Sequence, residues 1–166
     1  MWKPIALCLL LASATFAGDA YSPSTYVTKA EVDAALKEMP ATSFTYDKVL
    51  KTVDEGNYKV SVVILRRIPR AGIEDTALSH ERVTEVYYII SGSGTFESGG
   101  TMTNSSPYDL TAQAAGPSTR GTIAGGETKP IGPGDSVVIL PKVPHRFSHL
   151  NGTITYMVTR IEAKGK

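Results

Sequence analysis

Short runs of β-branched and aromatic residues, separated by glycine and proline, fill the chain after residue 40 and constrain its fold more than any other feature. Seven runs predict strands, at 58–68, 85–90, 94–96, 121–124, 136–140, 145–150 and 153–161. Gly125-Gly126 and Asn151-Gly152 predict hairpin turns. Many short strands with little helix are typical of an antiparallel sandwich or barrel, so we expect an all-β domain.

The first 17 residues have the pattern of a secretory signal peptide. A positive charge precedes the apolar run 5–11, and small residues lead to two fitting cleavage points, Ala17 and Ala20. A membrane span needs about 20 apolar residues, so this run is too short to be an anchor. We therefore expect a secreted or periplasmic protein. The only cysteine, Cys8, lies in this segment, so the mature chain uses neither a disulfide nor a thiol nucleophile.

Residues 18–40 are expected to form an arm and one short helix ahead of the barrel domain at 41–166. Thr28 and Glu31 have the spacing of a capping box, and Pro40 ends the helix near Met39. The apolar stripe of this helix predicts packing against the barrel exterior or against a partner subunit.

Residues 98–120 are rich in Gly, Ser, Thr, Asn and Pro and lack a sustained period. We expect a long loop that acts as a lid over the domain, with disorder as the alternative. The formal net charge is +1 and no basic stripe stands out, so neither nucleic acid nor a membrane surface is expected as a partner.

All three histidines of the chain fall in two short windows. His80 precedes Glu85, which begins a strand, and His145 follows the strand 136–140. Imidazole and carboxylate together suit Fe, Mn, Cu, Zn or Ni better than Ca or Mg. Taken singly, each histidine would be an ordinary strand residue, so the case for a site rests on the sequence around them.

Both windows resemble the motifs of the cupin family. The first motif, G-x5-H-x-H-x3-4-E-x6-G, is similar to 72–92, where His80, Glu85 and Gly92 match, and the second, G-x5-P-x-G-x2-H-x3-N, is similar to 134–149, where His145 matches. The resemblance implies an antiparallel jelly-roll (cupin) barrel, commonly a homodimer paired through edge strands. It also implies that His80, Glu85 and His145 bind one divalent transition metal.

The chain departs from these motifs at four positions. Leu78 replaces the first histidine of the H-x-H pair, and Leu140 and Lys142 replace a proline and a glycine. His149 stands where the family has asparagine. Residues four apart in a strand share a face, so His149 is expected to point inward with His145 as a fourth ligand, a substrate contact or a general base.

Two further side chains are candidates for the same cavity. Tyr87 shares a face with Glu85, which makes it a candidate catalytic residue beside His149, with a packed barrel tyrosine as the alternative. Arg66 shares a face with Val62 and Ile64, and an inward guanidinium there would hold a substrate carboxylate. The alternative for Arg66 is a barrel-end side chain that reaches solvent.

Two functions are compatible with this pattern. The first is a metal-dependent enzyme, a dioxygenase, oxidase or lyase, that acts on a small organic or sugar-derived substrate. The second is a non-catalytic small-molecule-binding cupin that has lost a metal ligand, which the apolar Leu78 favours.

Overall fold

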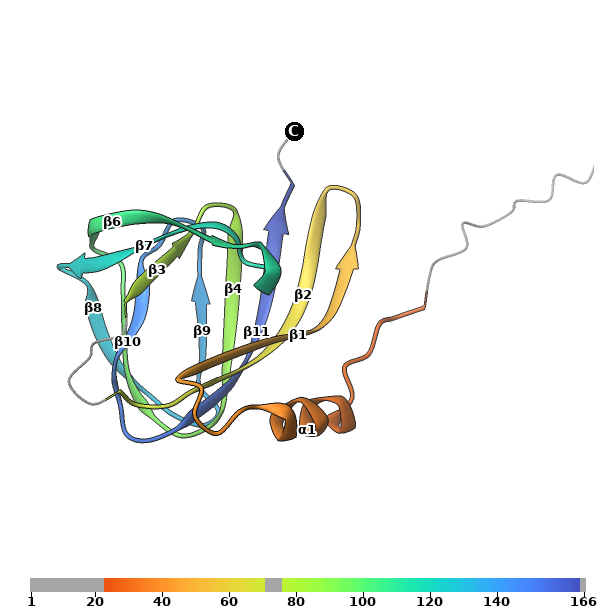
Figure 1. The fold of residues 1–166 in the computed structure, drawn as a ribbon. Helices are drawn as coiled ribbons and strands as arrows, with labels where there is room; N and C mark the ends of the chain where they lie inside the picture. The colour runs from red at the N-terminus through yellow and green to blue at the C-terminus, as the bar shows by residue number, and fades with distance from the viewer. Residues whose placement is uncertain (1–22, 71–75, 165–166) are drawn as a thin grey trace, which may run out of the picture.

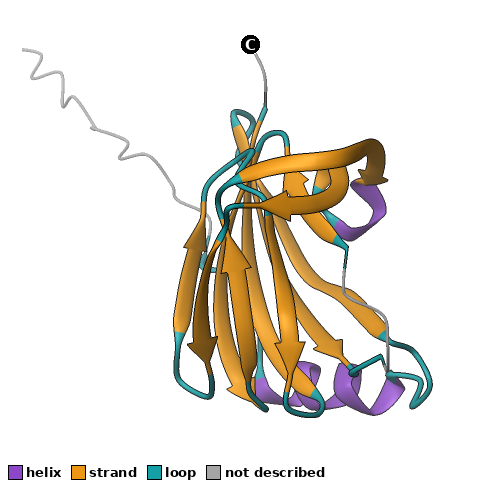
Figure 2. Cartoon of the chain, turned by 90° about the vertical axis from the view of Figure 1, so that its left-hand side faces the viewer, coloured by secondary structure: helices purple, strands orange, loops and turns teal. Residues whose placement is uncertain are grey.

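Two antiparallel sheets face each other in this computed structural model, which describes residues 23–70 and 76–164 (Figures 1 and 2). One sheet has the order β1 (Thr45–Asp54), β2 (Tyr58–Arg67), β11 (Ile154–Ala163), β4 (Val83–Ser91) and β9 (Ser136–Ile139). The other has the order β6 (Thr101–Leu110), β7 (Gly116–Ala124), β3 (Ala77–His80), β10 (His145–Leu150), β5 (Gly94–Ser98) and β8 (Glu127–Ile131). The predicted all-β, antiparallel class is confirmed.

The main core lies between the two sheets. Alternate residues of the strands point into it, and the interior side chains are mostly aromatic or β-branched. They include Val63, Leu65, Tyr87, Ile89, Phe96, Phe147, Ile154, Tyr156 and Val158. Burial of these side chains provides the main driving force for closing the barrel.

The predicted helix is present as α1 (Lys29–Glu38), on the outside of the barrel (Figure 1). The capping box forms, because the Thr28 hydroxyl accepts from the Glu31 amide at 3.3 Å while Glu31 Oε2 accepts from the Thr28 amide at 2.8 Å. Ala35 and Met39 pack on Ile64 of β2. Strand β2 is therefore buried on both faces, by the core on one side and by α1 on the other.

The prediction of a long loop at 98–120 is wrong. Most of this segment forms β6 and the first part of β7, which pair antiparallel and are joined by a 3₁₀ turn, η1 (Thr111–Gln113). The strands carry hydroxyl side chains instead of alternating apolar ones, so no hydrophobic period marks them. Cross-strand polar contacts take that place, such as Thr103 Oγ1 to Thr122 Oγ1 at 3.2 Å.

The two glycine turns join strands that do not pair with each other. Asn151-Gly152 does form a tight turn, with a φ of 111° at Gly152, but it links β10 of one sheet to β11 of the other. Gly125-Gly126 links β7 to β8, which lie apart in the six-stranded sheet. The hairpin predictions are therefore wrong, although the turns are where they were expected.

The predicted signal peptide, residues 1–17, lies outside the described residues. Within the described ranges, no helix has the length and apolar character needed to cross a membrane.

Candidate metal centre

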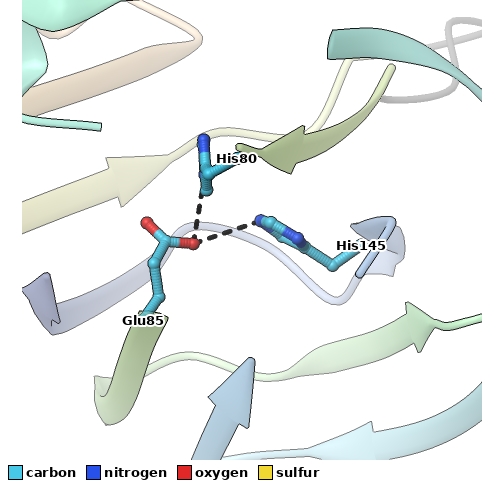
Figure 3. A group of neighbouring side chains, drawn as sticks. All are labelled: His80, Glu85 and His145. Carbon is cyan, nitrogen blue, oxygen red and sulfur yellow. Dashed lines mark ion pairs between the residues drawn. The ribbon is translucent and has the colours of Figure 1, made fainter. Parts of the chain in front are cut away.

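Three residues predicted as ligands meet inside the barrel, each from a different strand. His80 ends β3, Glu85 lies in β4 and His145 begins β10, so the two sheets contribute together (Figure 3). The residues are 4%, 0% and 4% exposed, respectively. Glu85 Oε2 is 3.3 Å from His80 Nε2 and 3.2 Å from His145 Nε2. The fold thus gathers two imidazole nitrogens and one carboxylate oxygen around one buried point.

The outer nitrogens of both rings are already engaged. His145 Nδ1 is 3.0 Å from the Val143 carbonyl oxygen, which only accepts, so this nitrogen carries the hydrogen. His80 Nδ1 is 2.8 Å from Ser118 Oγ, and the Ser118 hydroxyl donates to a backbone carbonyl at 3.0 Å. The serine oxygen is then left to accept from His80. In the neutral rings, both Nε2 lone pairs therefore point at Glu85.

This arrangement requires positive charge among the three groups. Two nitrogen lone pairs and a carboxylate oxygen repel one another unless a metal ion lies among them or both rings are protonated. Ligands that are each about 2.0–2.2 Å from one metal ion lie roughly 3.0–3.5 Å apart. The observed separations of 3.2 and 3.3 Å fall in this range. The residues therefore fit a transition metal, and the hydrogen-bonded Nδ1 atoms orient the rings as metal-bound histidines require.

Glu85 is held by two further contacts. Arg160 Nε donates to Glu85 Oε1 at 2.8 Å, and the Tyr87 hydroxyl donates to Oε2 at 3.2 Å. Arg160 and Glu85 are direct partners across β11 and β4. Both terminal nitrogens of Arg160 also donate hydrogen bonds to the Asp47 carboxylate, at 2.9 and 3.2 Å. This buried network fixes the carboxylate so that Oε2 faces the histidines.

The charge states follow from these contacts. Burial acts to raise the pKa of Glu85, but hydrogen bonds and positive charge from the His145 and His80 rings outweigh it and hold that pKa well below its usual 4.5. Burial raises the pKa of Asp47 despite the opposing charge of Arg160. Burial, with the nearby Glu85 charge, raises the pKa of Tyr87 well above its usual value. Glu85 is therefore anionic, and Tyr87 is a neutral hydrogen-bond donor.

A cavity of about 500 Å³ leads to this centre, and His80, Glu85, Tyr87 and Leu78 form part of its wall. Leu78 lies directly across from His145 in the β3–β10 pair. Leu78 therefore lies beside the cluster, and Tyr87, which is 3% exposed, faces inward with Glu85 as expected. An apolar side chain thus occupies the place where the cupin motif has another imidazole.

The predicted inward position of Arg66 is wrong. Arg66 lies on the outer face of β2 with Ile64, and its guanidinium donates to the Pro40 carbonyl behind α1. The neighbouring Arg67 faces the cavity instead. Because both faces of β2 are buried, the apolar pattern of the strand did not reveal which face is the interior.

The predicted inward position of His149 is also wrong. The pairing of β10 with β5 shifts register between Phe147 and His149, so the two-residue alternation that starts at His145 is broken. The His149 side chain is exposed. This position does not support a role as fourth ligand or general base at the buried centre.

Sequence reasoning missed the residues that support the ligands, namely Arg160, Asp47 and Ser118. Arg160 did leave a signal, because two-residue alternation places it with the core residues Tyr156 and Val158, and a charge on a core face requires a buried partner. Asp47 and Ser118 carried no comparable signal.

Comparisons with known proteins reveal the fold alone. No family model and no curated protein matches the sequence. Among solved structures, an uncharacterized conserved protein with a double-stranded β-helix domain from Klebsiella pneumoniae matches with a TM-score of 0.50 and 14% identity, over 87% of this chain and 100% of that one. KdgF from a Halomonas species matches with a TM-score of 0.45 and 14% identity, over 76% and 87% of the two chains.

A cupin_2 domain of an XRE-family transcriptional regulator from Enterobacter cloacae has a TM-score of 0.43 and 15% identity, over 75% of this chain and 100% of that one. The chain therefore has a double-stranded β-helix fold, with a buried His-Glu-His cluster that could hold a metal ion.

Proposed function

We propose that this protein is an exported, metal-dependent enzyme of the oxygenase or oxidase kind that acts on a small organic or sugar-derived molecule. The observation that carries the proposal is the buried convergence of His80 Nε2, His145 Nε2 and Glu85 Oε2 at the end of a cavity. Bound Fe, Mn or Cu would supply oxygen activation there, and Zn or Ni would supply Lewis-acid chemistry.

Each residue around that centre would have its own role in binding the metal or the substrate. His80 and His145 offer neutral nitrogens whose direction is set by Ser118 and Val143. Glu85 offers one oxygen while Arg160 holds the other. Three protein ligands leave coordination positions for a substrate, because Leu78 cannot bind a metal. Tyr87, which stays protonated, donates its hydroxyl hydrogen to Glu85 at the cavity wall.

Metal content tests the proposal directly. The purified wild-type protein is expected to contain close to one equivalent of a transition metal by elemental analysis, and His145→Ala is expected to lose it. His149→Ala is the matched control, because it removes the exposed histidine outside the cluster and should leave the content unchanged. Leu78→His should bind the metal more tightly, since it adds an imidazole beside the site. Equal metal content in wild type, His145→Ala and Leu78→His would disprove the assignment.

A second candidate is a non-catalytic binding protein, which Leu78 in the cavity wall favours because it makes the wall more apolar than a full ligand set would. Turnover separates the two functions. Oxygen uptake or product formation by the metal-loaded protein in a screen of small acids and sugars supports the enzyme, and saturable binding without turnover supports the binding protein.

Export is part of the proposal and is supported by the apolar run at the N-terminus. The mass of the protein recovered from the extracytoplasmic fraction should correspond to cleavage after Ala17 or Ala20. An intact N-terminus in that fraction would contradict it.

A further inference from the structure

The cavity that leads to the metal centre is lined by four arginines. Arg67 comes from β2, Arg120 from β7 and Arg160 from β11, and Arg70 follows β2. Two carboxylates of the described chain, Asp47 and Glu85, share the same wall, and Arg160 pairs with both. Among the described residues, the guanidinium groups therefore outnumber the carboxylates two to one.

The two exposed arginines have neutral partners within the described chain. The Arg120 guanidinium carbon lies 5.0 Å from the Tyr108 ring centroid, and its Nε contacts Ser106 Oγ at 3.4 Å. The Arg70 guanidinium carbon lies 4.6 Å from the Phe44 ring centroid. Aromatic faces hold guanidinium planes in place without neutralising their charge. Both side chains are thus positioned cations at the edge of a cavity.

A third arginine lies on the same wall in a more protected place. Arg67 is half-buried, and its Nε donates to the Tyr156 hydroxyl at 2.8 Å. The contact to Tyr156 fixes one side of the guanidinium against the core. Arg67 is therefore an anchored part of the cavity wall.

We propose that the ligand of this cavity is a small oxyanion, a molecule that carries a carboxylate or a phosphate group. Arg70 and Arg120 attract and hold this group, and the rest of the molecule faces His80 and Glu85. Planar guanidinium groups match both oxyanions, and a cavity lined by one sign of charge concentrates ligands of the other sign. The inference rests on the proposed function, since it assigns the substrate class of the same site.

The test compares charged ligands with neutral ones of similar shape. Glutarate and glutaramide form the carboxylate pair, and glycerol 3-phosphate and glycerol form the phosphate pair, each titrated calorimetrically into the metal-loaded protein. Glutarate or glycerol 3-phosphate, whichever binds, identifies the oxyanion, and both neutral compounds should bind far more weakly. Failure of both anions to bind at millimolar concentration, or equal binding of a neutral partner, would overturn the inference.

Substitution at the cavity edge provides the second arm. The double variant Arg70→Ala/Arg120→Ala should weaken oxyanion binding by about tenfold or more, because it removes two charge-assisted contacts. Lys37→Ala removes one positive charge from the exposed face of α1 and should bind like the wild type. A double variant with wild-type affinity would refute the inference.

Metal content keeps the two proposals apart. The double variant should retain the wild-type metal content, since neither arginine belongs to the His-Glu-His cluster. Wild-type protein that binds no metal refutes the proposed function. Metal-loaded protein that binds glutarate equally well with and without Arg70 and Arg120 refutes only the assignment of the ligand.

Discussion

Arg160→Met should strongly destabilise the fold even when no metal is bound. Arg160 is the buried cation that joins Glu85 of β4 to Asp47 of β1, at 2.8 Å to the first carboxylate and 2.9 Å to the second. Methionine fills much of the same space and removes the charge. Two carboxylates then lose their cation, and Glu85 is fully buried.

The expected cost follows from that burial. Removing one partner of a buried ion pair costs about 3–5 kcal/mol, because a charge is left without compensation in a poorly solvating interior. A small domain has about 5–15 kcal/mol of stability in total. With a urea m-value of about 1–3 kcal/mol/M, the unfolding midpoint should fall by roughly 2 M.

The assay is urea unfolding followed by circular dichroism, in EDTA so that metal does not contribute. Arg82→Met is the matched control, because Arg82 pairs with Glu162 at 3.0 Å while its side chain is 49% exposed. The surface pair should cost less than about 1 kcal/mol. An Arg160→Met variant as stable as Arg82→Met would refute the reasoning.

Acidification supplies an independent readout. Burial already raises the pKa of Asp47, and Arg160 is the strongest opposing influence, so its removal should raise that pKa further. A carboxyl whose folded pKa is raised binds more protons in the folded state than in the unfolded state, so its contribution to stability grows as the pH falls. The deficit of Arg160→Met should therefore shrink in acid. A pH-independent deficit would mean that lost packing, not charge, is its cause.

Three further outcomes are expected. Metal should dissociate as the pH falls below neutral, because protons compete for the imidazole nitrogens, and equilibrium dialysis over a pH series that shows no loss would contradict the ligand set. Gly92→Ala should lower the free energy of unfolding in urea by more than about 3 kcal/mol, since a Cβ there would lie 2.1 Å from the Thr153 carbonyl oxygen. Gly99 has the same φ of 79° but open space around it, so Gly99→Ala should lower this free energy by only about 1–2 kcal/mol. We also expect a homodimer whose interface covers the outer face of β4 and β9, where Tyr88 and Val138 are 51% and 64% exposed. Light scattering should show a dimer for the wild type and a monomer for Val138→Lys. A monomeric wild type would exclude this dimer.

Local patterns predicted much of the fold. The Thr28–Glu31 capping box and Pro40 placed the helix to within a residue, because capping depends on groups that are neighbours in the chain. The β-branched runs located seven of the strands for a similar reason. The hydroxyl-rich strand β6 and the first part of β7, residues 116–120, were not predicted, since polar cross-strand pairs carry no hydrophobic period.

The His-Glu-His cluster could also be predicted from the sequence, because motif spacing identifies His80, Glu85 and His145 whatever lies between them. The sequence predicted less reliably which face of its strand a side chain lies on. Arg66 and His149 were both placed inward by alternation from a neighbour, and both predictions were wrong. In the first case the outer face of the strand is buried by α1, and in the second a bulge interrupts the alternation.

The sequence by itself determined the class of fold, the helix, the turns and the three residues of the His-Glu-His cluster, because each depends on residue type and on short spacing along the chain. Only the tertiary structure decided which strands the turns connect and which arginines meet the ligands. Arg160 and Glu85 are 75 residues apart in sequence, and they become cross-strand neighbours only through the pairing of β11 with β4. That pairing is set by how the two sheets bury their apolar faces together, which is a property of the whole chain.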